Sequence, residues 1–302
     1  MVWFLQKQST DFISSNKQLA VPFKQLQALS FFKTITAIEE VSTGLSSQCF
    51  KVIADGKAFF VKKITTPNEV FASLFASEKG IGANVVYHDK NWLINPFIDG
   101  ENLALSQQPI EQKIAISMKL MQKIHKVNAK PAILMPAQII NEHICQPHFS
   151  TRQQADLTQL AKQLIKPLTQ DENTAYCHGD LNFSNVLITA KSEAFLVDFE
   201  CACSAPIEFD LAMFIAVNNI KHHEITMVLQ CYQQKSSAPI NRQLLNAYVL
   251  FCYLINGLWY VNRYHIGHQP TFKLLAQQQW EKLNKLLKNK YKQLFCCLGI
   301  KL

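Results

Sequence analysis

The chain has 302 residues, 48% of them hydrophobic, which suffices for one large domain or two lobes with a real core. Lys and Arg outnumber Asp and Glu by 30 to 22, and this excess favours polyanionic ligands such as nucleotides, although nucleic acid or anionic lipid would also match it. The apolar run in MVWFLQKQSTDF is too short for a secretion signal, and no stretch approaches the ~18 apolar residues of a membrane span. We therefore expect a cytoplasmic protein without a membrane span.

The nine cysteines and nine histidines show no zinc-site spacing. Several cysteines lie inside apolar segments, where free thiols behave as small hydrophobes. We predict reduced cysteines and no zinc centre.

The first third of the chain predicts a small antiparallel sheet. A helix is expected near Phe23–Phe32, followed by three strands between Ile35 and Lys63. A Ser/Thr-rich loop, Ser42–Ser47, follows the first strand, and Asp55-Gly56 forms a hairpin turn between the other two. The loop has one glycine, so its backbone N–H groups and hydroxyls would have to make any phosphate contact.

Two adjacent lysines end the third strand. A hairpin centred on Asp55-Gly56 pairs Cys49 with Lys62, opposite the apolar face formed by pairs such as Phe50 with Val61. Lys62 therefore emerges beside the preceding loop, where a cation can hold nucleotide phosphates. Lys63 is the competing candidate, but its place on the other face favours a strand end turned to solvent.

A helix is predicted from Asn68 to Lys79, with Asn68 as its N-terminal cap. Its apolar positions are Val70, Phe71, Leu74 and Phe75. Two short strands follow at Val85–His88 and Trp92–Ile94, and Asn95–Gly100 then breaks the pattern as a linker between lobes.

Beyond this linker the periodicity is mainly helical. Ile110–Val127 has a broad apolar face, and Gln153–Leu168 predicts another helix. His125 is interpreted as a packed structural histidine. Leu244–Tyr264 is a helical run rich in aromatic residues, which equally fits a core helix or an aromatic ligand wall.

The densest set of polar groups lies in Ala175–Glu200, AYCHGDLNFSNVLITAKSEAFLVDFE. Two short apolar strands flank a turn at 190–193, and a hairpin centred between Lys191 and Ser192 would place Asn185 directly across from Asp198. Such paired oxygen ligands suit Mg²⁺. Asp180, on the loop just before, could accept a proton from an attacking hydroxyl. The alternative is that these residues are ordinary turn formers.

This stretch resembles the aminoglycoside phosphotransferase and choline kinase group, relatives of protein kinases. Their catalytic loop reads HGDxxxxN and their metal motif reads D-[FW]-E, matching His178–Asn185 and Asp198–Glu200. The resemblance covers roughly residues 35–287, and it implies an α+β, bilobal protein-kinase-like fold. A small antiparallel-sheet lobe over 1–96 would bind nucleotide, and a larger, mainly helical lobe over 97–302 would carry catalysis and the acceptor.

The resemblance also implies roles for individual residues. Asp180 would be the catalytic base, with His178 as a brace of its loop, and Asn185 and Asp198 would hold Mg²⁺. Asp210 would open a helix and brace the same loop. The residues expected at the ATP are Lys62, Glu69, Gly44, Ser46, Asn95 and Phe97. Glu200 and Trp259 would face the acceptor.

The expected partners are ATP and a small-molecule acceptor, without nucleic acid. Asn256–Trp259 resembles a choline kinase stretch, and Tyr264–Leu287 is similar to the end of bacterial thiamine kinases. A cationic acceptor of choline, ethanolamine or thiamine type is therefore predicted. An aminoglycoside is the alternative, although only Glu142 and Asp156 are acidic between Lys130 and Leu168.

A different class of function also fits the sequence: a non-catalytic, kinase-like binder of nucleotide or of a lipid surface. Its support is the basic C-terminal segment, in which Trp280, Leu283, Leu287, Tyr291 and Leu294 would form one apolar stripe. The complete set of catalytic residues argues against it.

Overall fold

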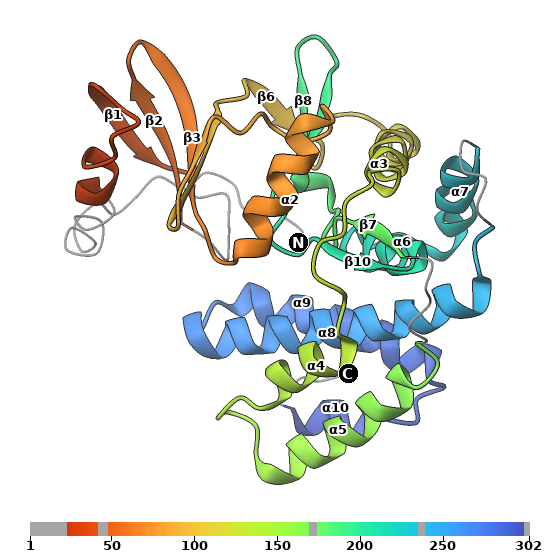
Figure 1. Ribbon diagram of the computed structural model, residues 1–302. Helices are drawn as coiled ribbons and strands as arrows, with labels where there is room; N and C mark the ends of the chain where they lie inside the picture. Colours follow the sequence, from red (N-terminus) through yellow and green to blue (C-terminus); the bar gives the residue numbers. More distant parts are fainter. Residues whose placement is uncertain (1–22, 42–47, 169–173, 235–238, 299–302) are drawn as a thin grey trace.

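The structure is a computed structural model that describes residues 23–41, 48–168, 174–234 and 239–298. Its first part is a five-stranded antiparallel sheet in the order β1-β2-β3-β5-β4 (Figure 1). The strands are β1 (Ile35–Glu40), β2 (Cys49–Ala54), β3 (Lys57–Lys63), β4 (Tyr87–His88) and β5 (Trp92–Pro96). The three strands predicted up to Lys63 are confirmed.

The β2–β3 hairpin has the predicted register, with Cys49 opposite Lys62 and Phe50 opposite Val61. Asp55 and Gly56 both have positive φ, 53° and 74°, which a two-residue hairpin turn of this kind requires. The Asp55 carboxylate also accepts hydrogen bonds from the backbone N–H groups of Lys33 and Thr34. The turn therefore fixes which face of β3 carries Lys62.

Helix α2 (Pro67–Glu78) differs from the prediction in its cap and in its buried face. The cap is Thr66, whose hydroxyl accepts from the Glu69 N–H, so the assignment of Asn68 as the cap was wrong. The large residues Phe71 and Leu74 are each 37% exposed. The buried positions are Glu69, Ala72, Ser73 and Ala76. Ala72 and Ala76 of this face belong to the large apolar cluster of the second part of the chain.

Two smaller sheets frame the stretch that carries the catalytic motif. One has the order β6-β8-β9, from β6 (Gly100–Asn102), β8 (Val186–Thr189) and β9 (Ala194–Leu196). The other pairs β7 (Ala175–Cys177) with β10 (Cys203–Ala205). At Gly100 a Cβ would lie 2.7 Å from the Ile188 carbonyl oxygen, so this strand crossing requires glycine.

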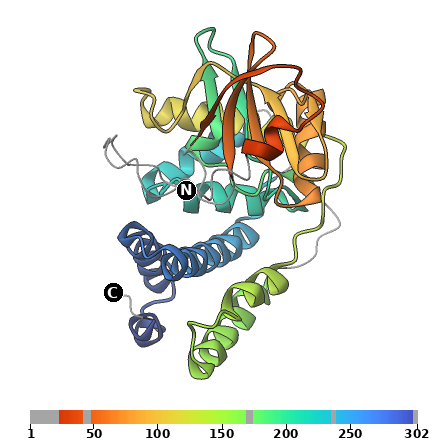
Figure 2. The same ribbon diagram turned by 90° about the vertical axis from the view of Figure 1, so that its left-hand side faces the viewer.

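Helices make up most of the second part. They are α3 (Ile110–His125), α4 (Pro136–Ile144), α5 (Thr151–Ile165), α6 (Ile207–Val217), α7 (His222–Gln233), α8 (Arg242–Gly267), α9 (Pro270–Leu286) and α10 (Lys292–Cys297). Helices α3, α5 and α8 confirm the predicted helical runs, whereas α4 was not predicted. The antiparallel-sheet and helical parts together confirm the predicted α+β class. In Figures 1 and 2 the α8–α9 pair separates the catalytic stretch from α4, α5 and α10.

Helix α8 is long and apolar enough to cross a bilayer, with a mean hydropathy of 1.5 over its most apolar window. Of that window, 72% is buried inside the protein, as expected of the central helix of a core.

The basic C-terminal segment is two helices rather than one stripe. The chain turns between α9 and α10, where Lys288 and Asn289 have positive φ. Trp280 and Leu283 are fully buried, and Leu287, Tyr291 and Leu294 pack against the same core. The apolar stripe is therefore used within the protein, which removes the main support for a lipid-surface binder.

The buried apolar residues form two clusters. The smaller one belongs to the five-stranded sheet and includes Phe50, Val61 and Trp92. The larger one fills the second part and includes Ala72 and Ala76 of α2. By packing, α2 therefore lies with the second part of the chain, and the division at residue 96 stays a prediction.

Candidate active site

A cleft of about 410 Å³ lies between the five-stranded sheet and the β8–β9 hairpin. Among the residues named from the sequence, those lining it are Lys62, Glu69, Asn95, Phe97, Asn185 and Asp198. Apolar side chains such as Leu93, Leu105 and Leu187 line the rest. A cleft with apolar walls and a few convergent polar groups has the composition of a small-molecule site.

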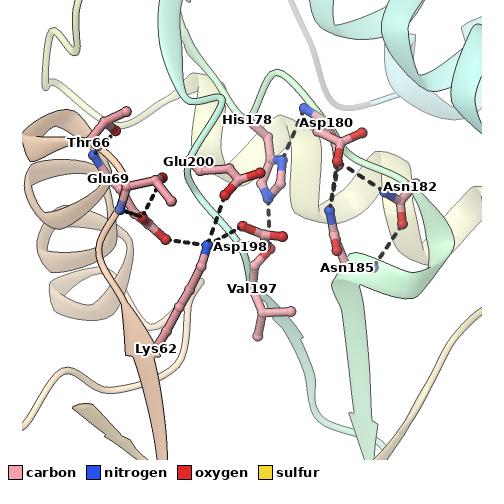
Figure 3. A network of polar contacts seen from close by, with 11 residues as sticks. Lys62, Thr66, Glu69, His178, Asp180, Asn182, Asn185, Val197, Asp198 and Glu200 are labelled. Carbon is pink, nitrogen blue, oxygen red and sulfur yellow. Dashed lines mark hydrogen bonds and ion pairs between the residues drawn. The ribbon is translucent and has the colours of Figure 1, made fainter. Parts of the chain in front are cut away.

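Lys62 is the central cation of the cleft. Its buried amine forms ion pairs with Glu69, with Asp198 Oδ1 at 2.6 Å and with Glu200 Oε2 at 3.3 Å (Figure 3). Burial alone would lower the pKa of this amine, but the three carboxylates outweigh burial and raise the pKa above its ordinary value. Lys63 is exposed, so the geometry favours Lys62 over its neighbour.

Glu69 reaches Lys62 from the first turn of α2. Its other oxygen lies 3.4 Å from both the N–H and the hydroxyl of Thr65. Burial raises the pKa of Glu69, and the charge of Lys62 opposes that shift. The pair is thus held by one strand and one helix.

Asp180 lies on the loop after β7. Its Oδ2 accepts hydrogen bonds from the side-chain amides of Asn182 and Asn185, each at 3.2 Å. The Asn185 amide also donates to the Asp180 carbonyl at 2.9 Å. Burial raises the pKa of Asp180, and the nearby charge of Asp198 adds to this rise. A carboxylate of raised pKa at the edge of a cleft is a candidate proton acceptor.

His178 joins the two motif segments. Its Nε2 donates to the Val197 carbonyl at 3.1 Å, while its Nδ1 accepts from the Asp180 N–H at 3.3 Å (Figure 3). One donating and one accepting nitrogen define a neutral imidazole. At Gly179, φ is 77° and a Cβ would lie 2.1 Å from the Cys201 carbonyl oxygen, so only glycine fits.

The β8–β9 hairpin is shifted by one residue from the predicted register. Val186 pairs with Leu196, and the Asn185 carbonyl accepts from the Val197 N–H, so Asn185 does not lie directly across from Asp198. The turn takes three residues and places Ser192 at a φ of 62°. Asp198 itself has a φ of 67°, a left-handed conformation at a cleft residue.

Asp198 and Asn185 offer oxygens of the kind that suits a hard divalent cation. The oxygens of Glu69, Asp198 and Glu200 lie within 4.8 Å of one another around the Lys62 amine, and Asn185 directs its amide nitrogen toward Asp180, which leaves its oxygen for other partners. Mg²⁺ takes such oxygens together with phosphate and water.

Asp210, in the first turn of α6, holds the loop that carries Asp180. Its two oxygens accept from the N–H groups of His178 and Gly179, at 3.0 and 2.9 Å, and from His125 Nε2 at 3.0 Å. Burial alone would raise the pKa of Asp210, but these donors lower it below its ordinary value. His125 also contacts the Tyr232 hydroxyl, so it is a packed histidine as predicted.

Two asparagines of the loop were not identified from the sequence. Asn182 caps the short helix at Phe183–Asn185, and Asn218 at the end of α6 binds the Leu181 carbonyl and the Phe183 N–H. The Asp-x-Asn-x-Ser spacing of the loop could have indicated the Asn182 turn. Nothing local indicates the role of Asn218, because its two bonds to the loop span 35 and 37 residues.

The other predicted nucleotide residues divide into three groups. Asn95 uses its side chain to hold the Ala83 and Asn84 carbonyls. The Phe97 N–H already donates to the Ala58 carbonyl at 2.9 Å, so it is not free for an adenine edge. Gly44 and Ser46 lie outside the described residues.

Trp259 is half-buried and packs against the core, with its ring 6.0 Å from that of Phe272. The Arg263 guanidinium lies 5.6 Å from the centre of the Trp259 ring. Tyr260, the next residue, is the one near the loop: burial raises its pKa, and the charge of Asp180 adds to the rise. No contact among the described residues joins Trp259 to the motif.

Fold and site together define a phosphotransferase of the kinase-like class. The sequence profile of the "Phosphotransferase enzyme family" matches residues 37–233, and the chain belongs to that family. It is 22% identical to "Probable choline kinase 2" of Arabidopsis thaliana over 73% of this chain and 74% of that protein.

Solved structures show the same fold. Choline kinase LicA from Streptococcus pneumoniae has a TM-score of 0.70 at 17% identity, covering 89% of this chain and 98% of LicA, and was also solved in complex with AMP. Spectinomycin phosphotransferase, in complex with ADP and spectinomycin, has a TM-score of 0.60 at 15% identity, covering 87% and 93%. The predicted bilobal kinase-like fold and the prediction of a nucleotide-using small-molecule kinase are confirmed.

Proposed function

We propose that the chain transfers the γ-phosphoryl group of ATP to the hydroxyl of a small cationic metabolite of choline, ethanolamine or thiamine type. The observation that carries this proposal is that a candidate base lies next to the cleft that contains the buried Lys62, because Asn185 lines that cleft and donates to Asp180. Asp180 has a raised pKa at the loop, and Lys62 lies in a cluster with Asp198. The first suits proton acceptance and the second suits phosphate binding.

The reaction follows from these positions. The acceptor oxygen attacks the γ-phosphorus, its proton moves to Oδ1 of Asp180, and the bond to the β–γ bridging oxygen breaks, so ADP leaves with that electron pair. Asn182 and Asn185 donate to Oδ2 and so orient the carboxylate, and His178 fixes the loop between Asp180 and Val197. Positioning of this kind supplies much of the catalysis of phosphoryl transfer.

Lys62 would exchange part of its contact with Asp198 and Glu200 for the α- and β-phosphates, while Glu69 keeps it in place. Asn185 and Asp198, with Glu200 nearby, would hold Mg²⁺, which supplies charge neutralisation at the β- and γ-phosphates.

Two observations favour a choline-type acceptor. Two similar proteins are a probable choline kinase and a choline kinase. Glu142 and Asp156 are exposed and do not line the cleft, so neither of them supports a polyamine sugar there.

An aminoglycoside or another small alcohol is the second candidate, and the likeness to spectinomycin phosphotransferase supports it. The test is ADP release with Mg-ATP and choline, ethanolamine, thiamine, homoserine, kanamycin or spectinomycin. We expect turnover with a cationic metabolite that depends on its hydroxyl, so a deoxy analogue is the control. Turnover with the antibiotics alone would contradict the choice of acceptor.

A further inference from the structure

Helix α2 carries Glu69, the partner of Lys62. Its last turn bonds to the first part of the chain through Ser77, which contacts Asn84 and Val85, but its buried apolar residues belong to the second part. Ala72 and Ala76 are fully buried in the large apolar cluster, and the described residues of the sheet cluster include none from α2. The Tyr176 hydroxyl of β7 donates to the Ala72 carbonyl at 2.6 Å. Glu69 is therefore presented to β3 by a helix whose buried apolar residues pack elsewhere.

Asn68 makes the most specific of these attachments. Its side-chain Nδ2 donates to the Ala202 carbonyl at 2.5 Å, and its Oδ1 accepts from the Ala132 N–H at 3.1 Å. An amide offers a donor and an acceptor on one short side chain, so neither Asp nor Leu could make both bonds. Both partners are more than 60 residues away in the sequence.

Both anchors are themselves held. Ala202 ends the turn that begins at Phe199, directly after Asp198, and its N–H donates to the Phe199 carbonyl at 3.1 Å. Ala132 accepts from the Ser204 N–H at 2.9 Å, which ties it to β10. Asn68 thus connects the first turn of α2 to the segment that carries Asp198 and Glu200.

We infer that Asn68 is a positioning residue for phosphoryl transfer. Asn68 sets the distance between Glu69, on one side of Lys62, and the Asp198–Glu200 pair on the other. The Lys62 amine is therefore held in position for the phosphates before the nucleotide binds. This inference rests on the proposed role of Lys62 in nucleotide binding.

The test combines nucleotide affinity with turnover. Asn68→Ala should weaken MgADP binding and lower kcat/KM for ATP by roughly tenfold, the scale of one lost hydrogen bond. Asn91→Ala, an exposed asparagine in the β4–β5 turn, is the matched control and should change neither. Tyr176→Phe removes another bond of the same helix and should act in the same direction, which keeps the test open if Asn68→Ala folds poorly.

A double-mutant cycle separates positioning from simple stability. If Asn68 acts through Glu69, Asn68→Ala should change nucleotide affinity less than twofold in a Glu69→Gln background. Additive losses, or an Asn68→Ala affinity equal to that of Asn91→Ala, would overturn the inference. An absence of ADP release with every acceptor would instead contradict the proposed function, and the MgADP affinities would still decide the role of Asn68.

Discussion

Asp180 belongs to the loop after β7, and Asp210 of helix α6 hydrogen-bonds the same loop. Their surroundings shift their pKa values in opposite directions. Asp210 receives three N–H donors, including His125, and its pKa is lowered. Asp180 receives only two neutral side-chain amides, lies near Asp198, and has a raised pKa. When two carboxyl groups have environments that shift their pKa values in opposite directions, one group serves as a structural anion and the other as a reactive group. Asp210 therefore fixes the loop, and Asp180 is its reactive residue.

The largest effect on turnover should come from substitution of Asp180. Asp180→Asn removes the proton acceptor and keeps the shape and the hydrogen bonds from Asn182 and Asn185. Turnover on a confirmed acceptor should fall by about 10²–10⁴-fold, with MgADP affinity unchanged. Steady-state kinetics and calorimetry measure both quantities. Turnover within a few-fold of the parent would show that Asp180 is not the base.

Asp198→Ala should affect metal and nucleotide together, because this carboxylate belongs both to the Lys62 cluster and to the proposed Mg²⁺ site. We expect activity to fall roughly 10²–10³-fold and the Mg²⁺ concentration for half-maximal turnover to rise. A Mg²⁺ titration of both proteins measures this. An unchanged Mg²⁺ requirement would move the proposed metal site away from Asp198.

The smallest effect concerns the acceptor. If Trp259 contributes to an aromatic wall, Trp259→Leu should raise the acceptor KM by up to roughly thirtyfold, which corresponds to ~0.5–2 kcal/mol, and leave the ATP KM unchanged. If Trp259 serves only its packing against Phe272 and Arg263, the variant should lose stability alone. With choline as acceptor, 3,3-dimethylbutanol is the neutral control. Equal losses for both compounds would exclude a cation–π contact.

The sequence predicted the structure correctly where a turn motif determines the register of two strands. The Asp55-Gly56 turn determined the β2–β3 register, and with it the direction of Lys62. The β8–β9 turn lacks glycine, so its register was misjudged by one residue, and the positive φ of Ser192 was not foreseen. A turn with a single strong signal can be predicted, whereas a turn built on a strained serine cannot.

Tertiary packing overrode the pattern in α2. The large apolar residues Phe71 and Leu74 remain partly exposed, while Ala72 and Ala76 are buried in the large apolar cluster, because the face of α2 that meets the second part of the chain is the one with alanines. The contacts of Asn68 join segments distant in the chain, and a lone asparagine carries no local signal of them. The motif residues were predictable because their spacing follows from one hairpin and one loop.

The most direct test of the contrast between the two aspartates is the free energy of unfolding of Asp180→Asn and Asp210→Asn, measured in urea near pH 7. The folded-state pKa of Asp210 lies below its unfolded value, so its charge stabilises the fold above the unfolded pKa, and that stability is lost as pH falls through the folded pKa. The folded-state pKa of Asp180 lies above its unfolded value, so its charge destabilises the fold at neutral pH, and the penalty disappears as pH falls through the raised pKa.

Asp210→Asn should therefore lose about 1.5–3 kcal/mol, the scale of a hydrogen bond to a charged group. Asp180→Asn should be at least as stable as the parent. Equal losses of stability in both variants would contradict the assignment of a structural and a reactive aspartate.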